Sequence, residues 1–520
     1  MEIKDRKTDV PLFIVRYLPQ FHRVKENDEW WGDGYTEWTA VRNAESLFFK
    51  HEQPRIPLDE RYYDLLDKGA MLWQANLAKK YGVGGFSFYH YWFKDGRRIL
   101  EKPAENLLKW QDVNMPFCFT WANETWARTW SKMRGGNAWG ERFETNAVIY
   151  DNDTGVLLEQ KYGEKKDWLQ HIRYLIPFFK DRRYIKKDGK PVLIIYKPDR
   201  LYCWPDMREC WEEELDKAGI SGLYVIGEVM TWNTNLSCDY DARMFREPNC
   251  SWHIMQSEKL SNGVRKYNYK DYWQDMLSRN WTVDQNDMPS YLCIADEFDN
   301  TPRNGNFGVV MQRDTVSRFR DNLCKTLDKV RNLGQEYVFY NAWNEWGEGM
   351  YLEPDTKEKY SRLEAVRDAL SNCSKIPDEQ NKEQNESSIY VCKVGKRADS
   401  KSADMVFVLD RWLLNREEGK NIADYMCKHG WSRIAIYGAG ILGRHLLTEL
   451  ADNHVKVMYI IDRDTNVRIR GCHIYQLTKE LPPVDVIVVT PVNKYGEIRR
   501  EIKKILKYKV VSLEHILFEM

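Results

Sequence analysis

The sequence predicts a (β/α)8 TIM-type barrel in residues 1–373, a polar linker in residues 374–402 and a small Rossmann-like α/β domain in residues 403–520. Eight short apolar runs precede residue 373. Each is followed by a longer helical or loop segment, which is the alternation of a parallel α/β fold. Polar and aromatic residues gather where most of these runs end. A glycine-rich turn after a later apolar run indicates a second α/β unit.

The eight runs are short and rich in β-branched and aromatic residues, as expected for strands buried on both faces. They span residues 11–17, 85–91, 116–121, 191–196, 223–229, 242–245, 291–295 and 337–340. Helices are expected where apolar residues recur at helical spacing between these runs. Examples are residues 70–81, 167–180 and 316–333.

The eighth run leads directly into two glutamates, Glu345 and Glu348, in the sequence NAWNEWGEGMYLEP. Side chains three residues apart can lie within about 5–6 Å of each other on a helical turn. Glycosidic cleavage needs such a pair, because one carboxyl protonates the leaving oxygen while the other acts on the opposite face of the sugar. Trp343 and Trp346 would offer flat apolar faces to a sugar ring. The alternative is that both glutamates are solvated loop acids and Trp346 is a core residue.

Other predicted strands also end in polar residues, which is where a barrel builds its active site. These ends are residues 16–22, 89–92, 121–126, Glu228, 246–247 and 296–297. His90 taken alone is more often a hydrogen-bonded core histidine than a catalyst. The long aromatic connection at residues 30–38 is expected to fold over the barrel mouth.

The composition argues against several classes of function. The 78 basic and 78 acidic residues give a formal net charge of zero, which leaves no electrostatic case for nucleic acid or an anionic membrane. The amino terminus has too short an apolar run for a signal peptide, and no stretch approaches the roughly 20 apolar residues of a membrane span. The 11 cysteines are scattered through apolar runs, so a reduced, cytoplasmic protein is expected. The 21 Trp and 30 Tyr are typical of a carbohydrate site or of a large aromatic core.

The predicted Rossmann-like domain begins with a helix over residues 405–427 and a strand that runs into Gly438, Gly440 and Gly443. Asp462 closes a second strand nineteen residues after Gly443. This G-x-G-x-x-G turn, its strand and the acidic residue match dinucleotide binding. The region of about 90 residues suits one mononucleotide-sized half. NAD or another nucleotide, a nucleotide sugar and a packing role without ligand therefore all stay open. The polar linker predicts that the domain folds independently.

Seven ordered motifs resemble the WbsX-type proteins of bacterial O-antigen and capsule gene clusters, which look like relatives of glycoside hydrolase family 99. The motifs are YLPQFH (17–22), NDEWWGDGYTEWT (27–39), QPRIPLD (53–59), YHYWF (89–93), WANETW (121–126), DNTPR (299–303) and NAWNEWGEGMYLEPD (341–355). The resemblance implies a (β/α)8 barrel, in agreement with the strand count. The last domain lies outside it and resembles small Rossmann-like modules attached to polysaccharide-biosynthesis enzymes.

The resemblance also implies that Glu345 and Glu348 are the catalytic carboxylates. The first would deprotonate the sugar 2-hydroxyl, which attacks its own anomeric carbon, and the second would act as acid and then as base. Gly347 stands where these hydrolases often carry histidine, so contacts around the site are expected to differ. The expected substrate-binding residues are Tyr17, Gln20, His22, Trp31, Glu37, Trp38, His90, Tyr91, Trp92, Trp121, Asn123, Glu124, Trp126, Glu228, Asp299, Arg303, Asn341, Trp343, Asn344 and Trp346.

Three classes of function fit these features. A retaining hydrolase or transglycosylase acting on a cell-surface polysaccharide would need no cofactor in the barrel. A glycosyltransferase with a nucleotide-activated donor would hold a metal-bound diphosphate through Asp-x-Asp, a pattern that residues 151–153, 239–241 and 462–464 all match. A non-catalytic sensor would couple a glycan in the barrel to a ligand on the glycine turn. No zinc-type spacing, P-loop or serine elbow is present, so no metal site is predicted. The expected partners are an oligo- or polysaccharide and other polysaccharide-assembly enzymes.

Overall fold

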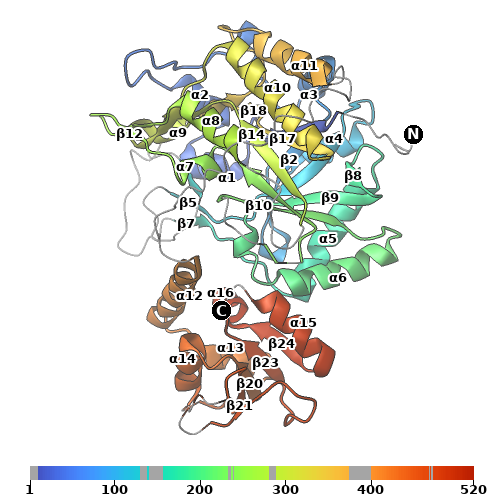
Figure 1. The fold of residues 1–520 in the computed structure, drawn as a ribbon, viewed down its shortest axis with the longest axis vertical. Coiled ribbons are helices and arrows are strands. Elements are labelled where there is room, and N and C mark those ends of the chain that lie inside the picture. The colour runs from blue at the N-terminus through green and yellow to red at the C-terminus, as the bar shows by residue number, and fades with distance from the viewer. Residues whose placement is uncertain are drawn as a thin grey trace, which may run out of the picture.

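The computed structural model describes residues 10–128, 137–139, 156–231, 236–237, 239–279, 288–373 and 400–520, except for residues 452, 466, 468, 470, 471 and 493. The predicted linker up to residue 399 and the Asp-x-Asp match at residues 151–153 lie outside these ranges. Figure 1 shows two parts, a large barrel above and a smaller carboxyl-terminal module below.

Eight parallel strands close into a barrel, as predicted. They are β1 (Leu12–Tyr17), β2 (Gly85–Trp92), β4 (Phe117–Trp121), β9 (Lys190–Ile195), β10 (Tyr224–Val229), β11 (Ala242–Arg246), β14 (Ser290–Ala295) and β17 (Tyr337–Asn341). The order runs β1-β17-β14-β11-β10-β9-β4-β2, and β2 returns to β1. Each strand agrees with a predicted run to within one residue at either end, which confirms the (β/α)8 fold class.

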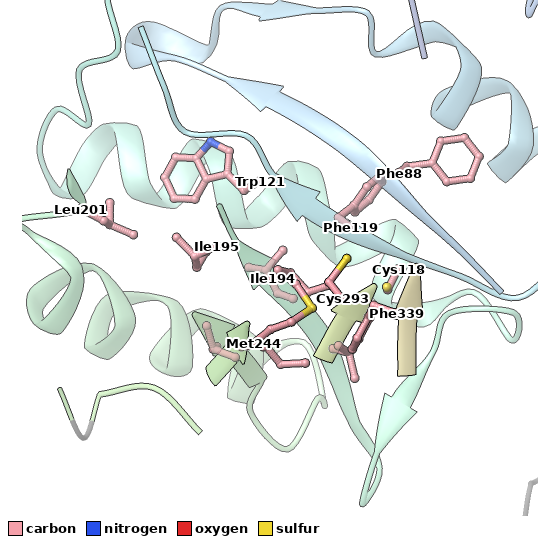
Figure 2. Packing of buried hydrophobic residues seen from close by; sticks show 14 of the residues in the cluster. Phe88, Cys118, Phe119, Trp121, Ile194, Ile195, Leu201, Met244, Cys293 and Phe339 are labelled. Carbon is pink, nitrogen blue, oxygen red and sulfur yellow. The ribbon is translucent and has the colours of Figure 1, made fainter. Parts of the chain in front are cut away.

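The strand register decides which side chains fill the barrel interior. Thr120 on β4 pairs with Ile194 on β9, and Arg246 on β11 pairs with Cys293 on β14, so these four residues share the inner face. Figure 2 shows Ile194, Met244 and Cys293 pointing toward one another, while Trp121 lies apart from them. The interior is thus a packed core below the mouth, as barrels of this size require.

Amphipathic helices cover the outside of the barrel. They are α3 (Lys68–Lys80), α4 (Lys102–Lys109), α5 (Lys165–Lys180), α6 (Trp204–Lys217), α8 (Tyr269–Ser278), α10 (Val316–Asn332) and α11 (Ser361–Cys373). The three predicted helices correspond to α3, α5 and α10. Side-chain caps fix their starts: Asp67 accepts a hydrogen bond from the Gly69 amide of α3, and Thr315 accepts one from the Arg318 amide of α10.

Several short elements lie over the mouth, at the carboxyl ends of the strands. The aromatic connection after β1 forms α1 (Lys25–Trp31) and α2 (Glu37–Arg42), and α2 contacts the short helix η6 (Trp346–Glu348). Another helix, α9 (Thr301–Asn304), also packs on η6. The connection after β1 therefore folds over the mouth as the sequence predicted.

The carboxyl-terminal module is an open parallel sheet with the strand order β22-β21-β20-β23-β24. Its strands are β20 (Arg433–Tyr437), β21 (Lys456–Ile461), β22 (Ile474–Tyr475), β23 (Val486–Val489) and β24 (Lys509–Ser512), and its helices are α12 (Ser400–Glu417), α13 (Ile422–Lys428), α14 (Ile441–Leu450), α15 (Tyr495–Ile505) and α16 (Leu513–Glu519). The five strands extend to both sides of β20, so the sheet is larger than the predicted mononucleotide-sized half.

One predicted helix of this module is corrected. Residues 405–427 form two helices, α12 and α13, because Gly419 takes a φ of +74° between them and Asn421 caps the second by accepting from the Asp424 amide. Among the described residues, no helix is long and apolar enough to cross a membrane. Independent folding of the module stays a prediction, and the module does touch the barrel, for example through Arg499 and Asp206 at 2.6 Å.

Candidate active site

The two predicted catalytic glutamates lie on a tight hairpin just after β17. Glu345 ends the short strand β18 (Asn344–Glu345), pairs with Met350 of β19 (Met350–Tyr351) and leads into η6, which carries Glu348. Gly349 closes the turn with a φ of +67°, which favours glycine. Both carboxylates therefore sit at the carboxyl end of the eighth barrel strand.

The guanidinium of Arg303 holds both of these carboxylates at once. Its Nη1 donates to Glu348 Oε1 at 2.6 Å, and its Nη2 donates to Glu345 Oε2 at 3.1 Å. A third carboxylate, Glu37 on α2, accepts from Nε at 2.8 Å and lies 2.7 Å from Nη2. The side chains of Arg303 and Glu345 are only 8% and 7% exposed, whereas that of Glu348 is 22% exposed. Glu348 is therefore the more accessible carboxylate of the pair.

Gly347 is required by this arrangement. A Cβ atom at residue 347 would lie 1.9 Å from Glu37 Oε1 and 2.9 Å from Arg303 Nε. Any side chain there, including the histidine common in family 99 hydrolases, would displace Glu37 from the guanidinium. The departure from the family pattern noted in the sequence therefore makes room for Glu37.

Burial and like charge shape the electrostatics of the pair. Burial and the neighbouring Glu348 raise the pKa of Glu345 to about 8, although Arg303 acts in the opposite direction. Burial also raises the pKa of Glu37, again opposed by Arg303. Two carboxylates in one site cannot both ionise freely, so Glu345 tends to keep its proton near neutral pH.

A second charged cluster lies deeper in the barrel. Arg16 of β1 pairs with Glu228 of β10, and Arg246 of β11 lies 3.4 Å from the other Glu228 oxygen while donating to the Tyr196 hydroxyl. Arg246 also interacts electrostatically with Glu348. This cluster therefore adds positive charge near Glu348 that does not come from Arg303.

Glu124, at the end of β4, faces the same space. It interacts electrostatically with Lys197, Arg246 and Glu348. Tyr91 of β2 interacts with Glu345 in the same way. Of the expected substrate-binding residues, the structure thus brings Glu37, Tyr91, Glu124, Glu228 and Arg303 together around the glutamate pair.

Several expected substrate-binding residues keep unsatisfied polar atoms near the mouth. Among the described residues, both side-chain polar atoms of Gln20, the indole nitrogen of Trp31 and Oε2 of Glu37 are buried and make no hydrogen bond within the protein. Such groups are rare in folded proteins and usually have a water or ligand partner. Two more expected residues are buried near them: Trp126 packs against Tyr91, and burial lowers the pKa of His22.

The tryptophans beside the glutamate pair are not sugar-stacking platforms, which corrects the interpretation of Trp343 and Trp346. Both are fully buried. Trp346 stacks on Tyr351 at 3.8 Å and donates to Glu353, and Trp38 packs on its other side. The aromatic faces are therefore used within the core.

Three further residues face away from the site. His90 lies 2.8 Å from His171 of α5, Trp92 stacks on the same histidine at 4.5 Å, and Trp121 meets it edge-on. Adjacent residues of a strand point to opposite sides of the sheet. Tyr89 and Tyr91 of β2 therefore face the barrel interior, and His90 and Trp92 face the surrounding helices. Burial lowers the pKa of His90 to about 3, so it stays neutral. Their assignment to substrate binding is corrected, and His90 is the core histidine that the alternative described.

The remaining expected residues support the backbone around the site. Asn344 exchanges two hydrogen bonds with the backbone of Leu18, and Asn123 does the same with Lys197. Tyr17 donates to Gln74, and Asn341 donates to the Glu247 carbonyl. Asp299 accepts from His51, Gln53 and Thr301. Asn344, Asn123 and Asp299 use all their polar side-chain atoms in such bonds, so their assignment is corrected to a supporting role. The assignment of Tyr17 and Asn341, for which one bond each is described, stays a prediction.

Three residues that line the site, Tyr89, Tyr196 and Arg246, are not among the expected substrate-binding residues, although the predicted polar strand ends at 89–92 and 246–247 include Tyr89 and Arg246. Tyr89 interacts electrostatically with Arg16, Arg246 and Glu345. The signal for Tyr89 was available, because Tyr91 was expected in the site and Tyr89 shares its face of the strand. Tyr196 and Arg246 stand at predicted strand ends, yet only their contacts identify them.

Possible cofactor and metal positions are few. Within the described ranges, no three His, Cys, Asp or Glu side chains come together as a metal site. Asp241 precedes β11, at the end of the barrel opposite the mouth, and pairs with Arg208. Asp462 accepts from the Ala439 amide at 2.6 Å, on the glycine turn of the module. The Asp-x-Asp match at residues 239–241 is therefore ruled out as a site for a donor in the barrel mouth.

A closed barrel with a clamped carboxylate pair at its mouth is the kind of site that carbohydrate-active enzymes use. Residues 13–366 match the protein family described as "Glycosyltransferase WbsX", and the chain belongs to this family. It is 32% identical over 377 residues to "Uncharacterized protein WxcX" of Xanthomonas campestris pv. campestris (strain B100), across 70% of this chain and 50% of that protein. The protein of the same name from strain ATCC 33913 matches equally well over 374 residues. The chain thus spans about half the length of the curated relatives it matches.

Two solved structures are similar in outline. The GH99 endo-alpha-mannosidase from Bacteroides thetaiotaomicron is 13% identical, with a TM-score of 0.42 over 70% of this chain and 97% of that chain. A "Glycoside hydrolase-like protein" is 12% identical, with a TM-score of 0.43 over 69% and 94%. Because these scores are low, the barrel architecture rests on the strand pairing of this chain itself.

We expect Arg303→Met to destabilise the protein by about 3–5 kcal/mol, because the buried carboxylates lose their cation. The loss should grow as the pH rises above the ordinary carboxyl range. Without the guanidinium the folded-state pKa values of these carboxyls rise, and folding must then hold protons that the unfolded chain releases. Urea unfolding at acidic and at mildly alkaline pH measures both effects.

A matched control is Arg318→Met, which removes a partly exposed ion pair between Arg318 of α10 and Asp314, which precedes that helix. It should cost no more than about 1 kcal/mol and show little dependence on pH. Equal losses in the two variants would mean that Arg303 does not organise the site.

Proposed function

We propose that this protein cleaves or transfers an α-linked glycosyl unit with retention of configuration, using Glu345 and Glu348 as its catalytic carboxylates. The observation that carries the proposal is the single guanidinium of Arg303, which binds both carboxylates at the mouth of the barrel. The unsatisfied polar atoms of Gln20, Trp31 and Glu37 support a polar, hydroxyl-rich ligand beside the pair.

The proposed reaction has two steps. The carboxylate of Glu345 takes the proton of the sugar 2-hydroxyl, whose oxygen attacks the anomeric carbon, while the carboxyl of Glu348 gives its proton to the departing oxygen. Glu348, now ionised, then takes a proton from water or an acceptor hydroxyl as that oxygen opens the three-membered ring, and Glu345 returns its proton to the 2-oxygen. Two inversions at the anomeric carbon give net retention.

Basicity and exposure bear on this division of roles. Once ionised, Glu345 is a stronger base than an ordinary glutamate, because its conjugate acid has a pKa of about 8, but the shared proton of the pair must first pass to Glu348. The greater exposure of Glu348 suits a group that must meet both the leaving group and the incoming acceptor.

A glycosyltransferase that uses a nucleotide-activated donor is the second candidate, and the description of the matched family favours it. In that case the carboxylate pair would act on a donor with a diphosphate leaving group, which needs little protonation. The two candidates differ in whether activity depends on a nucleotide sugar. A non-catalytic glycan sensor is disfavoured because the complete carboxylate pair is present.

We also propose that the protein acts inside the cell in bacterial cell-surface polysaccharide metabolism, alongside other assembly enzymes. The eight described cysteines are all free, and five of them are buried, which is usual for a reducing compartment.

The carboxyl-terminal module is proposed to bind a nucleotide or nucleotide sugar at its glycine turn. Gly438 has a φ of +107°, and a Cβ on Gly443 would lie 2.0 Å from the Gly438 carbonyl oxygen, so the fold itself requires these two glycines. Gly440 has an ordinary φ of −72°, and nothing lies within 4 Å of the Cβ it lacks. Its absent side chain leaves space at the amino terminus of α14, where a phosphate would bind.

The two glutamates should respond differently to removal. Glu348→Gln should slow donors with poor leaving groups by about 10²–10⁴-fold and spare aryl and fluoride α-glycosides, which need little protonation. Glu345→Gln should slow every donor by a similar factor, because attack by the 2-hydroxyl precedes any leaving-group advantage. Initial rates on matched donors measure this.

A 2-deoxy donor supplies the control, since the wild-type protein should not turn it over. Equal and modest losses for both variants on all donors would show that the glutamates only bind substrate. A crystal soaked with mannose- or glucose-configured imino sugars would show whether a ring lies over Glu345 and Glu348.

The pH dependence of kcat/KM tests the pair separately. The reaction needs one proton on the pair, held by Glu348 while Glu345 is ionised, so kcat/KM should fall as the pH rises above about 8, where the pair loses that proton. In Glu345→Gln this fall should move away from pH 8 in the residual activity. A kcat/KM that keeps its full value well above pH 8 would contradict a shared proton on the pair.

Nucleotide binding by the module can be tested with Gly440→Val. The added side chain meets no protein atom but fills the proposed phosphate position, so nucleotide affinity in calorimetry should drop at least about tenfold while the melting temperature stays unchanged. Ala451→Val, at the opposite end of α14, is the control and should bind normally. If the wild-type protein binds no nucleotide, the proposed site is wrong and the module has a structural role.

A further inference from the structure

The last helix of the chain carries a buried carboxylate into the barrel. Glu519 ends α16, and its side chain is only 2% exposed. Oε1 accepts from the amides of Tyr162 and Gly163 at 2.9 and 2.8 Å and from the Tyr202 hydroxyl at 2.8 Å, while Oε2 accepts from Lys94 at 3.2 Å. All four donors belong to the barrel. Figure 1 shows α16 and the carboxyl terminus on the side of the module that faces the barrel.

The module places this carboxylate firmly. Ser512, the last residue of β24, caps α16 by accepting from the His515 amide at 3.0 Å. Asn415 of α12 donates to the Leu517 carbonyl at 2.7 Å. Phe518 stacks on Tyr202 of the barrel, with ring centroids 5.2 Å apart. The position of Glu519 therefore depends on the folded sheet of the module.

Its targets, Tyr162 and Gly163, lie in the connection between β4 and α5. Gly163 has a φ of +62°, and a Cβ there would lie 2.2 Å from Asp167, so this turn admits only glycine. The Tyr162 hydroxyl accepts from the Asn123 amide nitrogen at 2.8 Å, and its ring meets Trp121 edge-on. These contacts link the turn bound by Glu519 to the end of β4.

The end of β4 in turn carries part of the active site. Asn123 is fixed between Tyr162 and the backbone of Lys197. The next residue, Glu124, interacts electrostatically with Arg246 and Glu348. One continuous chain of contacts therefore runs from Glu519 through Tyr162 and Asn123 to the neighbourhood of the catalytic pair.

We propose that Glu519 is a positioning residue, through which the carboxyl-terminal module holds Tyr162, and through it Asn123, in the position that presents Glu124 and Lys197 to the substrate. The inference rests on the proposed function for its effect on turnover, while the coupling itself needs no activity to be detected. The module then contributes to catalysis by positioning these residues, whether or not it also binds a nucleotide.

Hydrogen–deuterium exchange of the full-length protein tests the coupling. In Glu519→Ala, amides in residues 156–164 and in residues 121–126 should exchange about 10-fold faster or more, because the carboxylate that anchors the turn is gone. Glu519→Gln keeps an accepting oxygen for Tyr162 and Gly163 and should restore most of the protection. An unaltered circular dichroism spectrum shows that the variants are folded.

Arg499→Ala is the matched control. It breaks the contact of α15 with Asp206 and Glu209 of α6, in the same interface but without a link to the connection after β4. Exchange in residues 121–126 should stay unchanged in this variant. Equal acceleration in both variants, or acceleration in Glu519→Ala limited to residues 156–164, would overturn the inference.

Turnover supplies the second readout. If the proposed function holds, kcat of Glu519→Ala should fall by about 10²-fold, because Glu124 and Lys197 would no longer be correctly placed. Glu519→Gln should recover most of the loss. Wild-type kcat in Glu519→Ala despite faster exchange at residues 121–126 would overturn the positioning role. If the wild-type protein turns over no glycan, the proposed function fails, and the exchange pattern alone then decides whether Glu519 holds the connection.

Discussion

The guanidinium of Arg303 is the constraint on which the active site depends. Three carboxylates converge on it, from residues 266, 45 and 42 positions away in the chain. Without a cation such a group of buried acids would repel one another and take up protons. One cation cannot neutralise three carboxylates, so the site keeps an excess of negative charge. Burial and the charge of Glu348 therefore still raise the pKa of Glu345 to about 8. The interaction with Arg303 therefore holds the three carboxylates together and leaves one of them, Glu345, with a pKa close to neutral pH.

The sequence was sufficient for the barrel because buried parallel strands carry a strong local signal. All eight runs, and the place of Glu345 and Glu348 after the eighth, could be read from apolar residues and turns. The partnership of Glu37 with Arg303 carries no local signal, since it joins α2 to α9 across the mouth. The inward position of Tyr89, in contrast, follows from period-two alternation, and selecting His90 by residue type alone ignored it.

The abundance of tryptophan suggested carbohydrate stacking, but many of these rings build the scaffold. Trp343 and Trp346 are fully buried, and the indole of Trp346 donates to Glu353, whose pKa burial raises to about 7. A buried acid that accepts from an indole fixes the ring orientation, so these aromatic residues define the hairpin that carries the catalytic pair. Composition indicated the right class of protein, while the rings closest to the pair serve packing.

Contacts between residues far apart in the sequence close the barrel and attach the carboxyl-terminal module to it. The barrel closes where β1 pairs with β17, the strand that leads into Glu345 and Glu348, so the position of the hairpin with both glutamates depends on the meeting of the first and last strands. The connection after β4 has a turn whose amides bond to Glu519 at the other end of the protein. Both amides take their acceptor from the module, so without Glu519 they would have to bond to water. The module is thus bound to the barrel at a point where it supplies an acceptor for the barrel's own backbone, and Tyr162 links that point through Asn123 to the end of β4.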